Sequence, residues 1–316
     1  MSVFYFQNDH YPEWIRFRDL GREFSFGHPR GVAYERDGYF FATGLNHGGE
    51  AVAALTNGRS ITDWIVQTFG DSSPFESANE PGVSFKRIAR PTTLGFLRSD
   101  PAIGEKINES FVALRILLRK LEELFETIEP TPSNASTYGH RIRDVLLLAC
   151  MEVESSWTAV LKENAYGMMG AMLKTNDYVK LSRAMMLDGY ELSLQSYGSY
   201  PAFAPFANWD STRPTQSLGW YDSYNKTKHN REGNLHHATL GNAIRAVGAA
   251  VVMFYGQFGI NFGTGVLDQK SPIIRNTFRL TTVGLERHER DFYVPLFRIQ
   301  DGQIIVESWS TVDYAF

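Results

Sequence analysis

The chain has 316 residues, of which 43% are hydrophobic and 14% aromatic, so it can bury the core of one large domain or two ordinary ones, and general disorder is excluded. The formal net charge of −4 gives no global basic field of the kind that favours nucleic acid, although a local basic patch is compatible with it. The single cysteine, Cys150, excludes an intrachain disulfide and any multi-cysteine metal site, and its apolar neighbours predict a buried, inert thiol.

The first third of the chain is predicted to be irregular and rich in β-structure. Asp37-Gly38 and Asn57-Gly58 supply the positive φ angles that tight turns need, and Ser60 is a typical helix N-cap. The elements expected in chain order are a hairpin over residues 31–44, a strand over 50–55, a short helix over 60–69 and a loop over 71–82.

From about residue 100 apolar residues recur at steps of three and four, which is the spacing of amphipathic helices. Helices are predicted over residues 100–129, 138–164, 178–187, 215–231 and 235–258, with Asn234 as a candidate cap of the last one. A strand and a loop are expected over residues 190–208, a glycine-bearing loop over 259–272, and a second hairpin turned by Asp301-Gly302 near the end.

Together these elements predict a mainly α protein, a bundle of about five helices with β-hairpin segments at both ends of the chain that could pair with each other. The predicted division is a β-rich segment over residues 1–98, a helical bundle domain over 99–260 and a C-terminal β-hairpin extension over 261–316 that packs on the rest. The N-terminus lacks the features of a signal peptide, and no apolar run is long enough to cross a bilayer, so we expect a cytoplasmic protein with no membrane partner.

The stretch from Trp220 to Arg231 concentrates aromatic, amide, cationic and imidazole groups in about three helical turns. At 3.6 residues per turn Trp220, Tyr224 and Thr227 share one face, whereas Asn225 and His229 are neighbours on another. A helix that buries the indole therefore displays the amide and the imidazole away from the core.

This stretch also carries a local cationic cluster, made up of Lys226, Lys228, His229, Arg231 and, from the next helix, Arg245. Such a cluster attracts phosphate, and the rings of Tyr221 and Tyr224 offer faces on which bases could stack. The alternative interpretation is an ordinary solvated helix end, whose cations are favoured by the helix dipole.

No motif for a phosphate-binding loop, a dinucleotide site, a zinc protease or a serine hydrolase is present. His229, His236 and His237 do not predict a metal site, because adjacent helical positions diverge by about 100° and Gly233-Asn234 is expected to break the helix between them. No cofactor is predicted. Of Glu152 and Glu154, which cannot face the same way, one could reach into the bundle and pair with a lysine or arginine; solvated carboxylates are the alternative.

The segment Asn225-Lys226-Thr227-Lys228-His229, on the fourth of five predicted helices, resembles the HEPN superfamily, whose ribonucleases often carry the motif Arg-Asn-x-x-x-His. The resemblance covers roughly residues 100–258, and Tyr224 stands where the motif has its arginine. It implies a helical bundle that dimerises across this helix and places two histidine-bearing motifs in one cleft, where RNA is cleaved without a metal ion.

The roles that the resemblance implies are general acid and base for His229 and polar positioning for Asn225. Lys226, Lys228 and Arg231 would meet the charge of the phosphate, and Tyr221 would contact the substrate. We therefore expect an RNA-cleaving or RNA-binding homo-oligomer, a metal-independent endoribonuclease if it is an enzyme, of the kind found in bacterial defence or toxin systems. Because the arginine is missing, the alternative is a non-catalytic protein-interaction or structural module.

Overall fold

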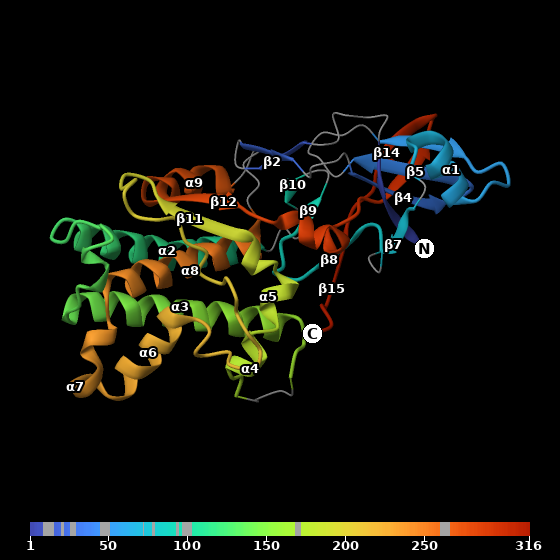
Figure 1. Ribbon diagram of the computed structural model, residues 1–316. Coiled ribbons are helices and arrows are strands. Elements are labelled where there is room, and N and C mark those ends of the chain that lie inside the picture. The colour runs from blue at the N-terminus through green and yellow to red at the C-terminus, as the bar shows by residue number, and fades with distance from the viewer. Residues whose placement is uncertain are drawn as a thin grey trace.

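The computed structural model describes residues 1–8, 16–19, 22–25, 30–44, 51–71, 73–77, 80–92, 95–96, 103–167, 172–259 and 266–316. It shows an elongated molecule with a β-sheet at one end and a group of long helices at the other (Figure 1). Within the part of the chain that is described, no helix is long and apolar enough to cross a membrane.

The sheet end is built on five antiparallel strands in the order β6-β5-β4-β1-β7. The strands are β1 (Val3–Gln7), β4 (Arg30–Arg36), β5 (Tyr39–Gly44), β6 (Val52–Leu55) and β7 (Phe75–Ser77). The predicted hairpin is confirmed, since Asp37 and Gly38 take φ angles of 51° and 78° between β4 and β5. The helix α1 (Ile61–Phe69) begins as predicted at Ser60, whose hydroxyl accepts from the Asp63 N–H, and it covers one face of the sheet.

The other face of the sheet is covered by the end of the chain. The second predicted hairpin is confirmed as β13 (Phe297–Gln300) and β14 (Gln303–Val306), and Phe297 stacks on Tyr34 of β4. The last strand, β15 (Ser310–Val312), pairs in parallel with β8 (Val83–Phe85), so β-segments from the two ends of the chain do pair. The remaining strand pairs are β2 (Arg16–Asp19) with β3 (Arg22–Ser25), β9 (Pro91–Thr92) with β10 (Gly95–Phe96), and β11 (Tyr190–Leu194) with β12 (Phe278–Thr282).

The helical end is centred on α8 (Leu240–Phe258), which is buried along almost its whole length and packs against α2 (Ile103–Phe125) and α3 (His140–Glu163). The helix α6 (Gly219–His229) lies against α3 and α8. Shorter elements complete this end: α4 (Thr175–Tyr178), α5 (Leu181–Ala184), α7 (Arg231–Asn234), α9 (Val266–Thr277), and the 3-10 turns η2 (Asn134–Ser136), η3 (Leu187–Gly189), η4 (Leu235–His237) and η5 (Leu285–Asp291).

A mainly α fold is therefore the wrong class: of the described residues 46% are helical and 21% lie in strands, and the sheet has five strands. Two strands of this sheet were missed, and outside it β2, β3, β8, β9, β10, β12 and β15 were not predicted individually. Val3–Gln7 carries four aromatic or β-branched residues that pair with β4, and Phe75–Ser77 falls inside the segment expected to be a loop. The pairings join segments far apart in sequence, which local patterns do not reveal.

Other boundaries also differ from the prediction. Residues 178–187 form short turns rather than one helix, and α8 starts at Leu240 with Thr239 as its cap instead of Asn234. The loop expected over 259–272 contains the start of α9 from Val266, while residues 260–265 lie outside the described part.

The two ends of the molecule are joined by residues 83–92, which cross from the sheet end to the ends of α3 and α8. The buried Arg90 guanidinium donates to the carbonyl oxygens of Ala184 and Asp291 and lies 5.2 Å from the ring centres of Phe85 and Tyr314. Because its donors are satisfied, this buried charge ties three segments together.

Candidate functional site

The helix α6 is oriented by an apolar stripe, as its sequence predicts. Trp220, Tyr224 and Thr227 are each at most 2% exposed, and the Trp220 indole nitrogen donates to the Pro205 carbonyl oxygen at 2.9 Å. Because this stripe is buried, the other side chains of α6 lie beside the helix or point to solvent.

The C-terminal end of α6 comes earlier than expected. The helix stops at His229, and Asn230 leaves helical geometry with its side chain accepting from the Gly233 N–H, which starts α7. Arg231 is the first residue of α7, and its side chain lies outside the described part.

The imidazole and the amide are displayed in different ways. His229 is exposed, and its ring has no hydrogen-bond partner among the described residues. Asn225, one turn earlier, is half-buried, and its amide nitrogen donates to the Tyr221 carbonyl oxygen at 2.9 Å. The outward position of His229 follows from the helical spacing. One amide hydrogen of Asn225 is already used in the bond to its own helix.

The two lysines of the motif separate. Lys226 forms an ion pair with Asp222 at 2.7 Å along the helix. Lys228 turns to the other side, where its ammonium is 2.9 Å from the Tyr224 hydroxyl and 5.0 Å from the centre of that ring. They therefore serve two different surfaces.

Tyr221 is 4% exposed and is not available for stacking on a base. Its hydroxyl donates to Glu154 Oε1 at 2.5 Å, and the Tyr224 hydroxyl is 3.1 Å from Glu154 Oε2. Burial, followed by the charge and hydrogen bonding of Glu154, raises the pKa of both tyrosines well above the usual range, so both phenols remain protonated donors. Glu152 and Glu154 are both half-buried; Glu154 bonds to α6, and its partners are phenols and not the expected lysine or arginine.

Arg245 does not contribute a free cation, because its guanidinium lies 5.8 Å over the Phe203 ring. The sequence interpretation missed cations at the start of α3. The Arg143 guanidinium donates to the Thr227 carbonyl oxygen at 3.1 and 3.3 Å, which brings the exposed His140 and Arg141 to the end of α6. The helix predicted over residues 138–164 already placed His140 and Arg141 in its first turn. The packing of α3 on α6 shows which helix end they lie against.

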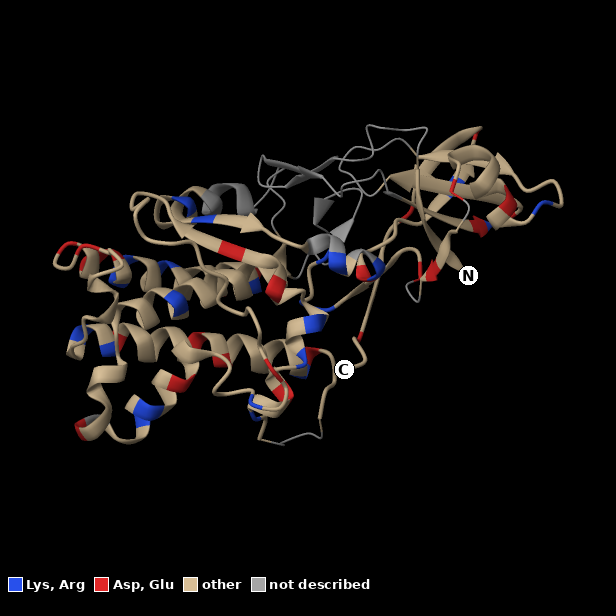
Figure 2. Cartoon of the chain, in the orientation of Figure 1, with Lys and Arg blue, Asp and Glu red and all other residues tan. Residues whose placement is uncertain are grey.

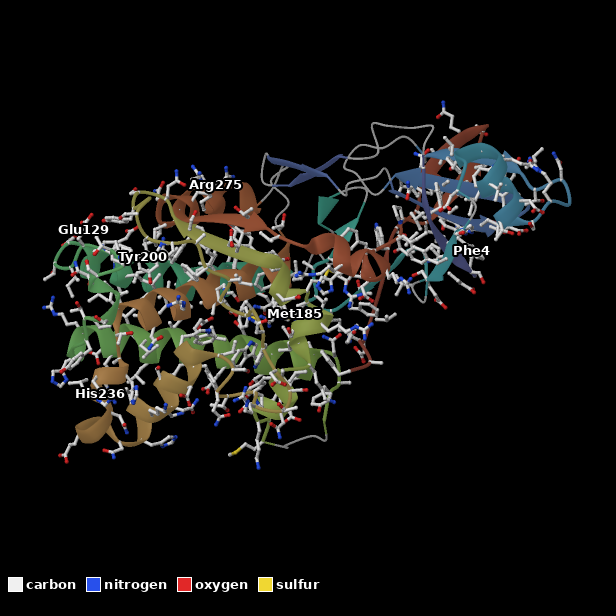
Figure 3. The ribbon with its side chains drawn as sticks, viewed as in Figure 1. Phe4, Glu129, Met185, Tyr200, His236 and Arg275 are labelled. Atoms are coloured by element: carbon white, nitrogen blue, oxygen red, sulfur yellow. The ribbon has the colours of Figure 1, made fainter. Side chains whose placement is uncertain are left out.

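Two further histidines complete this region. His236 and His237 of η4 have their ring centres 4.1 Å apart, and Figure 3 shows His236 at the end of the helical part where α3 begins. We call this region the basic end and define it by His140, Arg141, Arg143, Lys226, His229, His236 and His237. Among the described residues no group of three or more histidine, cysteine or acidic side chains is placed to hold a metal ion.

Cys150 is fully buried on α3, which confirms the predicted burial, and burial raises the pKa of its thiol well above the usual range. No protein-family model, no curated protein and no solved structure matches the chain.

Proposed function

We propose that the protein binds RNA at the basic end and that His229 moves protons in a metal-independent cleavage of the strand. The observation that supports this proposal is the convergence of three segments, the start of α3, the end of α6 and η4, on one end of an acidic molecule (Figure 2). In the basic end defined above, the ion pair between Lys226 and Asp222 is the one contact of a cation with a carboxylate among the described residues. Arg141 and Arg143 have no carboxylate partner among the described residues, and their charges favour phosphate.

The backbone adds to this field. α3 is 24 residues long, and no side chain caps its N-terminus, since the residue in that position is Gly139. The first N–H groups of a helix carry a partial positive charge and bind phosphate oxygens well. Arg141 extends from this same turn and is exposed.

The proposed chemistry is attack of a ribose 2′-hydroxyl on the adjacent phosphate, which leaves a 2′,3′-cyclic phosphate and a free 5′-hydroxyl. The His229 ring is exposed and has no partner in the described structure, so both of its nitrogens can exchange protons with a substrate. Arg141 and Lys226 meet the phosphorane charge in place of the missing motif arginine. A homodimer that brings two copies of His229 together would supply a base and an acid at once.

RNA binding is tested by fluorescence anisotropy with a labelled single strand over a series of salt concentrations. We expect Arg141→Gln with Lys226→Gln to weaken binding at least tenfold at low salt and to reduce the salt slope by about 1.4, since each phosphate contact of a single strand contributes about 0.7. The matched control removes two cations from α2, with Arg115→Gln and Lys120→Gln, and should bind as the wild type does. Equal losses in both double variants would show nonspecific attraction and remove the proposed surface.

Cleavage is tested separately with His229→Ala. The variant should bind RNA with nearly unchanged affinity and release no products with cyclic phosphate ends. Equal cleavage by both proteins, or none by either, would remove the enzymatic part and leave RNA binding.

A second candidate function, a protein-interaction module, is favoured by a different observation. Val112 and Ile116 on α2 and Leu148 and Met151 on α3 are 39–57% exposed, and the two helices pack against each other. Exposed large apolar side chains on neighbouring helices favour an interaction site. Light scattering at high salt, where RNA affinity is lost, would detect self-association that does not depend on charge.

A further inference from the structure

A separate cavity lies on the outer side of α3, between α4 and α6. Its volume is about 590 Å³, and it is open to solvent. The residues of α3 that line it recur once per turn, and Tyr178, Tyr224 and Lys228 close its sides. We call this cavity the α3–α6 groove. Its volume lies within the range of about 300–1,000 Å³ that is usual for small-ligand sites.

Two ammonium groups in the groove lack a carboxylate partner. Lys228 is hydrogen-bonded to the neutral Tyr224 hydroxyl, and Lys162 has no hydrogen-bond or ion-pair partner among the described residues. Elsewhere in the described structure Lys86, Lys106 and Lys226 are each paired with an acid at 2.7 Å. The lysines of the groove are therefore left to attract an anion from solvent.

Glu154 also lines the groove, but its two oxygens accept hydrogen bonds from the buried phenols of Tyr221 and Tyr224. These donors hold the carboxylate on the α6 side, where its charge is already stabilised. Two cations face one carboxylate, so the groove has a net charge of about +1 at neutral pH.

The lining between the lysines is suited to an ester of phosphoric acid. Ser155 and Thr158 present hydroxyl groups, and Met151 and Ala159 present apolar surface. A phosphomonoester carries a charge of about −1.5 to −2 at pH 7, which two ammonium groups can balance, and lysine is a common point-charge binder of phosphate. We propose that the α3–α6 groove binds a terminal phosphomonoester, with the Lys162 and Lys228 ammonium groups attracting the phosphate and the groove holding the attached organic group.

This site is distinct from the basic end. Lys226 and Lys228 are two residues apart on α6 and so diverge by about 200°, in agreement with their separate partners Asp222 and Tyr224. The phosphomonoester could belong to a free mononucleotide or to the 5′-phosphate end of an RNA strand. The groove proposal does not depend on RNA cleavage.

The test is calorimetric titration of the full chain with adenosine 5′-monophosphate and with adenosine. We expect the nucleotide to bind with a dissociation constant of about 1 mM or tighter, and adenosine at least tenfold more weakly. Lys162→Gln and Lys228→Gln should each weaken binding of the nucleotide about tenfold, since a hydrogen bond to a charged group contributes about 1.5–3 kcal/mol. The matched control, Lys120→Gln on α2, should bind as the wild type does.

A second pair of probes separates the two sources of the phosphate. A short RNA with a 5′-phosphate is compared with the same RNA ending in a 5′-hydroxyl. Tighter binding of the phosphorylated strand, lost in Lys162→Gln, identifies the strand end; binding of the mononucleotide without that difference identifies a free nucleotide. The basic-end variant Arg141→Gln with Lys226→Gln should keep its affinity for the mononucleotide, which distinguishes failure at the two sites.

Near-ultraviolet circular dichroism confirms that each variant is folded before it is compared. Three outcomes would each overturn the proposal. The first is that the wild type does not bind the nucleotide and binds the two RNA strands with equal affinity. The others are equal binding of nucleotide and nucleoside, and unchanged nucleotide binding in both groove variants.

Discussion

The two ends of the molecule keep their polar groups in different places. At the sheet end the space between the strands and α1 is filled by an apolar cluster, namely Phe6, Ala33, Phe40, Ala42, Trp64, Ile65 and Phe69. At the helical end the contact between α3 and α6 includes the half-buried Glu154 with two phenols, and the α3–α6 groove borders that contact. A charge removed from water lowers stability unless it is hydrogen-bonded, so the contact of Glu154 with two phenols distinguishes the helical end from the apolar cluster of the sheet end.

The largest expected effect is on the aromatic packing of the helical end. Trp157 is fully buried, and five aromatic rings lie with their centres 4.9–6.3 Å from its own. Trp157→Ala should lower the free energy of unfolding by about 3–5 kcal/mol. In the sheet end the Trp64 ring pairs with two aromatic rings of the described residues, Phe40 and Phe69, so Trp64→Ala should lower the free energy of unfolding by less.

Urea unfolding followed by circular dichroism measures both losses. A larger loss for Trp64→Ala would mean that the small cluster over the sheet, and not the helical interior, dominates the stability of the chain.

The next effect concerns the buried carboxylate. Glu154→Gln removes the negative charge that, after burial itself, raises the pKa of Tyr221 and Tyr224. We expect a loss of about 1–3 kcal/mol in the free energy of unfolding, because two buried hydroxyls lose a charged acceptor. Urea unfolding of the variant and of the wild type measures this loss, and an unchanged free energy of unfolding would contradict the proposed role of Glu154.

The sequence predicts the local features of both ends, because turn and cap residues act on their own neighbours. The left-handed backbone at Asp37-Gly38 and Asp301-Gly302 and the cap at Ser60 needed no tertiary information. The exposure of His229 and the burial of Trp220 followed in the same way from the helical period.

What the sequence could not predict depends on long-range pairing. The buried hydroxyl of Tyr221 faces Glu154, which is 67 residues away, so a tyrosine that looked available for stacking is internal. The cations at the start of α3 join the end of α6 through Arg143 and Thr227, 84 residues apart. The same limit explains the missed strand β1, whose partner β4 lies beyond a long connection.

A smaller effect is expected at the turns of the sheet end. Gly38 has a φ of 78° with open space around its Cα, so Gly38→Ala should destabilise the hairpin by about 1 kcal/mol through backbone strain alone. The matched control is Gly219→Ala at the start of α6. There φ is not in the left-handed region, and an added Cβ would meet no neighbouring atom within 4 Å. That variant should be neutral or should stabilise by up to about 1 kcal/mol. Thermal unfolding of the two variants gives the sign directly, and a stabilising Gly38→Ala would contradict the turn assignment.

The smallest effect is expected where the two ends meet. The Asp188 carboxylate lies 2.9 Å from His288 Nε2 and 3.5 Å from Arg287, and it joins η3 of the helical end to η5, which leads into the segment on the sheet. The hydrogen bond from His288 holds the pKa of Asp188 below its usual value of 3.8. A carboxyl group whose pKa is lowered in the folded state stabilises the fold at pH values above its unfolded-state pKa, and this stabilisation is lost as the pH falls through the folded-state pKa.

Because the Asp188 carboxylate is partly exposed, Asp188→Asn should lower the free energy of unfolding by only about 0.5–1 kcal/mol at pH 7. The difference from the wild type should persist at pH 5 and shrink below about pH 4, as urea unfolding at each pH would show. A difference that disappears already between pH 7 and pH 5 would contradict the lowered pKa of Asp188.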